Sequence, residues 1–154
     1  MNIFMLDSDP TFAAQYHVDK HCVKMILEYA QLMSTAHHLC GGSTDVYRAT
    51  HKNHPSAIWV REGSDNYQWL YSLWQALSDE YTFRYSKVHK SWEMLSETLK
   101  QIPRGIPIGS TPLRLAMPDQ YKQSDPVESY REYYIGDKKH IATWSKRNMP
   151  DWWE

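Results

Sequence analysis

A polar stripe with side chains suited to acid–base and phosphate chemistry runs along one segment near the start of the chain. Its seven residues follow the spacing of one face of an α-helix: His17, Lys20, His21, Lys24, Glu28, Gln31 and Thr35. Nearly all other residues of that segment are apolar, which is typical of a buried helix. Because buried charged groups need partners or water, we interpret the stripe as the wall of an active site.

The alternative interpretation of the stripe is the solvated face of an ordinary surface helix. Lys24 and Glu28 would then form only an i,i+4 ion pair, which stabilises a helix by about 0.2–0.5 kcal/mol. The two histidines favour the active-site interpretation, because exposed helix faces are more commonly built from Lys, Glu and Arg.

Cap and breaker residues predict a mostly α-helical chain that folds as one compact single-domain bundle over residues 1–154. Residues 2–6 are expected to be extended, and the Gly- and Pro-rich stretch 103–124 is expected to form a long loop. A break near Gly63 or Ser64 is expected at the start of the second helix. The expected helices, bounded by caps, prolines and glycines, are one long helix from about 10 to 40, then 58–85, 88–101, 126–136 and a last turn around 141.

The composition limits the class of protein. A length of 154 residues with 42% hydrophobic content suffices for one core, and a net charge of −1 excludes the overall basic field of many duplex-DNA binders. Any nucleic-acid site must therefore come from a local cluster, to which the 11 tyrosines and 7 tryptophans could add stacking surfaces.

Nothing in the sequence indicates a membrane span or a signal peptide. No run of about 18 apolar residues occurs, and no basic start precedes an apolar run. Cys22 and Cys40 form no metal-binding pattern, so we expect free thiols in a reducing compartment. We therefore expect a cytoplasmic protein, in the host cytoplasm if a phage encodes it; its oligomeric state is not indicated.

Four histidines offer ligands for a metal ion, but their context argues against one. His17 and His21 have the i,i+4 spacing that two ligands of one metal can use, and His51 and His54 follow. The glutamate of the His-Glu-x-x-His motif is missing, and neighbouring lysines would place positive charge beside the cation. We expect neither a metal nor a cofactor.

Two further segments suit the binding of phosphates and bases. Asn53 and His54 precede Pro55 at the start of a predicted helix, where free N–H groups can bind an anion, although the same pattern marks any helix start. Tyr121-Lys122 and the segment 129–134 interleave basic with aromatic residues, which is typical of surfaces that bind a phosphate backbone and stack on bases.

Several of these motifs resemble the phage endonuclease V type pyrimidine-dimer DNA glycosylases. The run from Gln15 to His21, with Glu28 nine residues after Asp19, is similar to the helix of that family that carries Asp-x-His and then its catalytic glutamate. His54 followed by a long helix, and the aromatic segment 130–138 with its glycine, are further likenesses. The Asn-His-Pro-x-x-x-Trp element at 53–59 resembles a broader set of small bacterial and phage proteins that carry the same family name.

The resemblance implies a mostly helical DNA repair enzyme that excises a damaged pyrimidine base. Such enzymes flip bases out of the duplex, attack the sugar C1′ with an N-terminal α-amine, and cleave the abasic strand through an imine, as a glycosylase and AP lyase. An α-amine has a reference pKa of about 8, so much of it is neutral and nucleophilic near neutral pH. The family's glutamate would correspond to Glu28.

Three groups remain open as the nucleophile. Asn2 is bulky, so Met1 should often be retained and would supply the amine; if Met1 is removed, Asn2 supplies it, and Lys24 with a lowered pKa is the third choice. The remaining candidates for substrate binding are His17, Lys20, His21, Gln31, Asn53, His54, Arg61, Tyr121, Lys122, Tyr130, Arg131 and Tyr134.

Two other classes of function stay open beside the glycosylase. One is a non-catalytic module that binds a nucleotide or a nucleic-acid end, and the other is a hydrolase or transferase that acts on free nucleotides. The expected partner is therefore damaged duplex DNA or a nucleotide, not a membrane.

Overall fold

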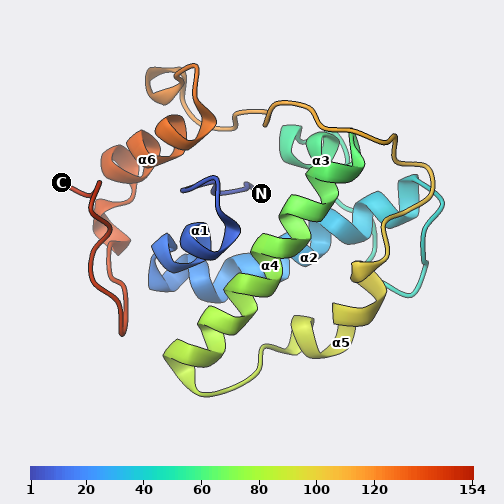
Figure 1. Cartoon of the computed structure of the whole chain (residues 1–154), viewed down its shortest axis with the longest axis horizontal. Coiled ribbons are helices and arrows are strands. Elements are labelled where there is room, and N and C mark those ends of the chain that lie inside the picture. The colour runs from blue at the N-terminus through green and yellow to red at the C-terminus, as the bar shows by residue number, and fades with distance from the viewer.

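The structure, a computed structural model that describes residues 1–154, contains helices and no strands (Figure 1). The mostly α-helical fold predicted from the sequence is therefore confirmed. The elements in chain order are α1 (Pro10–Tyr16), α2 (Asp19–Leu39), α3 (Pro55–Val60), α4 (Ser64–Tyr85), α5 (Lys90–Lys100), the 3-10 turn η1 (Asp119–Tyr121), α6 (Pro126–Asp137) and the 3-10 turn η2 (Lys139–Ile141).

Side-chain caps fix the starts of several helices where the sequence predicted them. Asp9 accepts a hydrogen bond from the backbone N–H of Thr11 before Pro10, and Asp125 accepts one from Val127 before Pro126. His54 caps α3 in the same way through its ring nitrogen, which accepts from the N–H of Ser56. These caps place the first residue of each helix.

The predicted single helix from 10 to 40 is wrong, because the chain breaks at His17 and Val18 into α1 and α2. The Arg84 guanidinium donates to the carbonyls of Gln15 and His17 at 3.0 and 2.9 Å, and the Trp144 indole donates to the carbonyl of Tyr16 at 2.8 Å. These carbonyls are thus satisfied by distant side chains instead of by the next helical turn.

The helix predicted from 58 to 85 is two helices, α3 and α4, with the expected break at Gly63. A Cβ atom at Gly63 would lie 2.4 Å from the carbonyl oxygen of Gly109, so only glycine allows this close approach. The helix predicted at 88–101 corresponds to α5, and the loop predicted at 103–124 contains only the short turn η1.

The two long helices form the centre of the molecule. Figure 1 shows α4 crossing α2, with α5 and α6 on opposite sides and the start of the chain between α6 and α3. One connected hydrophobic core runs from Ile3 to Trp144, so segments near both termini pack into the same interior. No helix has the length and apolar character needed to cross a membrane.

Candidate active site

The start of the chain lies in a pocket of about 170 Å³ between α2 and α6. The N-terminal segment contributes Met1 and Asn2, and α2 contributes polar side chains of the predicted stripe. The lining residues are Met1, Asn2, Phe4, His21, Lys24, Met25, Glu28, Tyr133 and Lys138. All three other predicted catalytic candidates, Met1, Asn2 and Lys24, thus lie in one cavity with Glu28.

The α-amine of Met1 and the Glu28 carboxylate form an ion pair in this pocket. The amine nitrogen lies 3.3 Å from Glu28 Oε1, and the two side chains are 4% and 13% exposed. Glu28 Oε2 is buried without a hydrogen bond, and the nearest cation, Lys24 Nζ, lies 3.7 Å away on a side chain that is 69% exposed. Because buried carboxylate oxygens are normally hydrogen-bonded, Oε2 is open to a further donor.

Asn2 fixes the position of the first residue. Its amide donates to the carbonyl of Ala116 at 2.8 Å, and its Oδ1 accepts from the Tyr130 hydroxyl at 2.6 Å and from the backbone N–H of Ile3 at 3.0 Å. Tyr130 is fully buried, so its ring is not accessible to a ligand, and its hydroxyl instead holds Asn2 in place. These bonds hold the amine beside Glu28.

His21 forms a wall of the pocket in its neutral form. Its ring stacks on Phe4 with 4.3 Å between centroids, and its Nδ1 lies 2.6 Å from the hydroxyl of the fully buried Tyr134. Burial, and next the charges of His17, Lys138 and the α2 lysines, lower the pKa of His21 to about 3. At neutral pH His21 therefore adds no charge to the pocket.

His54 lies close enough to the chain start for the N-terminal charge to affect its pKa. Burial and then the N-terminal ammonium lower the pKa of His54. Its Nδ1 accepts the capping hydrogen bond from Ser56, so the neutral ring carries its proton on Nε2 and can donate from there. No three histidine, cysteine or carboxylate side chains lie close enough together to hold a metal ion.

His17 lies outside the pocket, although the stripe placed it beside His21. It is fully buried, its Nδ1 lies 2.7 Å from the carbonyl of Ala13, and its Nε2 lies 2.7 Å from the Tyr29 hydroxyl. Burial lowers the pKa of His17 to about 4. The break between α1 and α2 turns His17 away from the face of α2, which leaves it a hydrogen-bonded core residue.

Other predicted residues on or next to α2 and α3 do not line this pocket. Lys20 is exposed one turn before Lys24, and Gln31 is half-buried. Asn53 is exposed next to His54, and Arg61 bonds the carbonyl of Ala57 in its own helix at 3.3 Å.

The predicted aromatic and basic residues of the C-terminal part are held by their own partners. The Tyr121 hydroxyl donates to Asp137 at 2.7 Å, and Lys122 pairs with Asp119 at 2.9 Å. Arg131 bonds the carbonyl of Leu6 at 2.8 Å and the Asp7 carboxylate at 3.1 Å. None of these three lines the pocket around Met1.

Tyr133 and Lys138 line the pocket although the sequence candidates did not include them. Both lie in the segment 130–138 that the sequence singled out, and Lys138 Nζ lies 4.9 Å from the centre of the Tyr133 ring. A repeat of basic and aromatic residues marked this segment, but only the packing of α6 beside the chain start shows which members reach the pocket.

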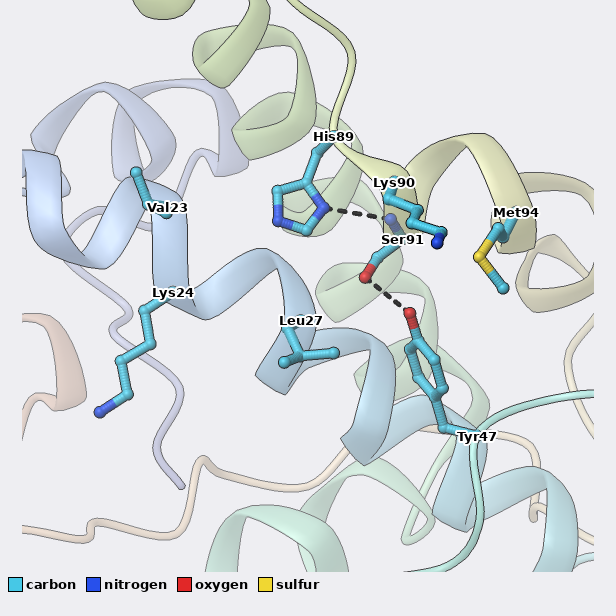
Figure 2. Close-up of a pocket in the computed structure, with 8 residues that line it drawn as sticks. All are labelled: Val23, Lys24, Leu27, Tyr47, His89, Lys90, Ser91 and Met94. Carbon is cyan, nitrogen blue, oxygen red and sulfur yellow. Dashed lines mark hydrogen bonds between the residues drawn. The ribbon is translucent and has the colours of Figure 1, made fainter.

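A larger cavity of about 560 Å³ lies on the other side of Lys24, between α2 and the start of α5 (Figure 2). Its walls include the exposed apolar side chains of Val23, Leu27 and Met94, and the Tyr47 hydroxyl lies 2.8 Å from Ser91 Oγ. No carboxylate lines it. The Met1 amine and the Glu28 carboxylate line the smaller pocket and not this larger one.

A family model described as pyrimidine dimer DNA glycosylase matches residues 1–94. The matched part includes Met1, Asn2, α2 with Glu28, and His54, whereas Tyr133 and Lys138 lie beyond it. No curated protein and no solved structure matches the chain.

Proposed function

Because the chain belongs to the pyrimidine dimer DNA glycosylase family, we propose that it removes a dimerised pyrimidine base from DNA through an imine and then cuts the abasic strand. Family membership implies DNA glycosylase activity and damaged DNA as the ligand. The observation that carries the finer mechanism is the Met1 amine 3.3 Å from Glu28 inside one pocket.

The proposed first step uses the amine as nucleophile and Glu28 as its partner. The neutral amine attacks C1′ of the sugar, a bond forms between nitrogen and C1′, and the glycosidic bond breaks with its electron pair leaving on the base. Glu28 accepts a proton from the amine and stabilises the positive charge that develops on the sugar. Ring opening then gives the imine.

The proposed second step cleaves the strand by β-elimination. A base removes a proton from C2′ of the protonated imine, and the C3′–O bond breaks with its electron pair leaving on the phosphate. The buried Glu28 Oε2, which has no hydrogen bond, is the available acceptor for such a proton. Water then hydrolyses the unsaturated imine and returns the free amine.

We propose the α-amine rather than Lys24 as the nucleophile. The Met1 side chain is 4% exposed, so the amine is enclosed together with Glu28. The Lys24 side chain is 69% exposed and projects from the surface of α2. If Met1 is removed during maturation, Asn2 would carry the amine at the same start of the chain. Mass spectrometry of a trapped peptide decides among the three.

Borohydride trapping tests this proposal. The protein is incubated with ultraviolet-irradiated duplex DNA and with abasic-site duplex, with sodium borohydride to reduce an imine and without it to allow strand cleavage. We expect a covalent adduct and a nick with the unchanged protein, and loss of both with Glu28→Gln. Glu97→Gln, an exposed glutamate of α5 without an ion pair, is the matched control.

The small pocket and the net charge of −1 also suit a hydrolase or transferase that acts on free nucleotides, or a nucleotide-binding module. The salt dependence of binding separates these from a DNA enzyme. Each phosphate contact with duplex DNA adds about 0.9 to the slope of log K against log salt, so a duplex ligand gives a steep slope and a mononucleotide a shallow one. No adduct together with a shallow slope would rule out the proposed mechanism.

A further inference from the structure

Lys138 is a cation of the pocket that has no carboxylate partner. It caps the end of α6, its side chain is half-buried, and its ammonium lies 4.9 Å from the centre of the Tyr133 ring. The neighbouring Asp137 carboxylate instead accepts from the Tyr121 hydroxyl, and no ion pair involves Lys138. Lys24, by contrast, shares Glu28 with the Met1 amine.

The charges that line the pocket do not balance. The protonated amine, Lys24 and Lys138 are cations, Glu28 is the single carboxylate, and His21 is neutral. This excess of positive charge occurs on a chain whose net charge is −1, so it is local to the pocket. Cations gathered around a small cavity favour the binding of an anion, and a phosphate group is the anion that DNA offers.

We propose that Lys138 binds the phosphate on C3′, the group that leaves when the strand is cut. This inference rests on the proposed imine mechanism. With C1′ joined to the Met1 nitrogen, the carbon C3′ that carries this phosphate is separated from C1′ by C2′ alone, whereas C5′ and its phosphate lie two carbons farther along the opened sugar. The amine and Lys138 line the same pocket of about 170 Å³, which suits the nearer phosphate.

The role assigned to Lys138 concerns the elimination and not the formation of the imine. When the C3′–O bond breaks, its electron pair and the resulting negative charge pass to the phosphate, and an ammonium group beside that phosphate stabilises the charge. Attack of the amine on C1′ creates no charge on this phosphate. Lys138 should therefore affect strand cleavage far more than adduct formation.

Single-turnover kinetics on abasic-site duplex separate the two steps. We compare Lys138→Met, which keeps an apolar side chain against Tyr133, with Lys139→Met, an adjacent exposed lysine outside the pocket. Lys138→Met should leave the rate of borohydride trapping within about twofold and slow nicking at least about tenfold, since single donors to developing charge have effects of that size or larger. Lys139→Met should change neither rate, and Lys138→Arg should restore most of the nicking.

The outcomes distinguish this inference from the mechanism on which it rests. Normal nicking by Lys138→Met would overturn the assignment, as would an equal fall in trapping and nicking, which would indicate a general contact with DNA. The retained trapping rate itself reports that the variant is folded and binds substrate. Absence of any adduct with the unchanged protein would instead overturn the proposed function.

Discussion

Two carboxylates in this molecule, Glu80 and Glu28, both have two cationic neighbours but differ in how closely these neighbours bind them. Glu80 is 4% exposed, and both of its oxygens accept hydrogen bonds from guanidinium groups of Arg84 and Arg147 at 2.8–3.0 Å. Glu28 lies at 3.3 and 3.7 Å from its two amines, and one of its oxygens has no hydrogen bond.

The difference shows which carboxylate has an oxygen that is free to accept another hydrogen bond. Bidentate guanidinium bonds saturate a carboxylate and fix the elements that carry the partners, here α4 and the C-terminal segment. Longer contacts to amines keep the charge near but leave a lone pair for another group. The cluster of Glu80 joins α4 to the C-terminal segment, whereas the cluster of Glu28 is the one to which we assign the proposed chemistry.

The largest expected effect is on stability and concerns Glu80. Glu80→Ala leaves the Arg84 guanidinium, which is 0% exposed, without its closest carboxylate, and breaking a buried pair in this way typically costs about 3–5 kcal/mol. We expect urea unfolding to show such a loss, while trapping of abasic-site DNA by the folded fraction stays unchanged. A loss below about 1 kcal/mol would contradict the structural role of this cluster.

Glu28→Gln should show the opposite pattern. General acid–base groups typically contribute at least about 100-fold to a rate, so trapping and nicking should fall by that factor or more. The free energy of unfolding should change by no more than about 1 kcal/mol, because the ion pairs lost are long and one includes an exposed lysine. A similar loss of stability in both variants would remove the contrast between the two clusters.

Lowering the pH should destabilise the protein through two buried histidines, His17 and His21. The pKa values of His17 and His21 are lowered to about 4 and about 3 from an ordinary 6.5, so the unfolded chain binds more protons at pH values between these and 6.5. The contribution of the two histidines to the free energy of unfolding is therefore fully present above pH 6.5. It falls as the pH drops, by at most about 1.4 kcal/mol per pH unit for each histidine.

Urea unfolding at pH 7, 6 and 5 checks this acid sensitivity. His17→Asn should make the dependence less steep, leaving the contribution of His21, whereas His38→Asn, at an exposed position, should leave it unchanged. An equally steep dependence without His17 would place the acid-sensitive group elsewhere.

Tyr130→Phe should give the smallest effect. It removes the hydroxyl that donates to Asn2 at 2.6 Å, which typically costs about 1 kcal/mol of stability and loosens the residue next to the amine. Trapping should slow several-fold, since nucleophile placement controls the rate. Tyr67→Phe, which removes a buried hydroxyl bonded to the Leu99 carbonyl at 2.6 Å, should cost similar stability without slowing trapping.

The sequence predicted what depends on neighbouring residues. Caps at Asp9, His54 and Asp125 act within two residues, so helix starts could be located, and the i,i+4 spacing of Lys24 and Glu28 was enough to place them on one face of α2. No glycine or proline in the sequence marks the break at His17. It depends on Arg84 and Trp144, which lie far along the chain, so no local pattern could predict it.

The candidate site was predicted for the same reason only in part. The candidates Met1, Asn2, Lys24, His21 and Glu28 line one pocket, but the contact of the amine with Glu28 and the arrival of Lys138 join segments that only the packing of the core brings together. The roles of these residues in substrate binding and catalysis remain proposals.

The enclosed start of the chain has a practical consequence for anyone producing the protein. A purification tag fused ahead of Met1 would convert its amine into an amide, which lacks a basic lone pair. The chain of the tag would also have to pass through the pocket of about 170 Å³ beside Glu28. Under the proposed mechanism, a tag of this kind would yield folded but inert material unless a protease restores the free first residue. Glu154 is exposed, so the other end of the chain offers a site for fusion away from the amine.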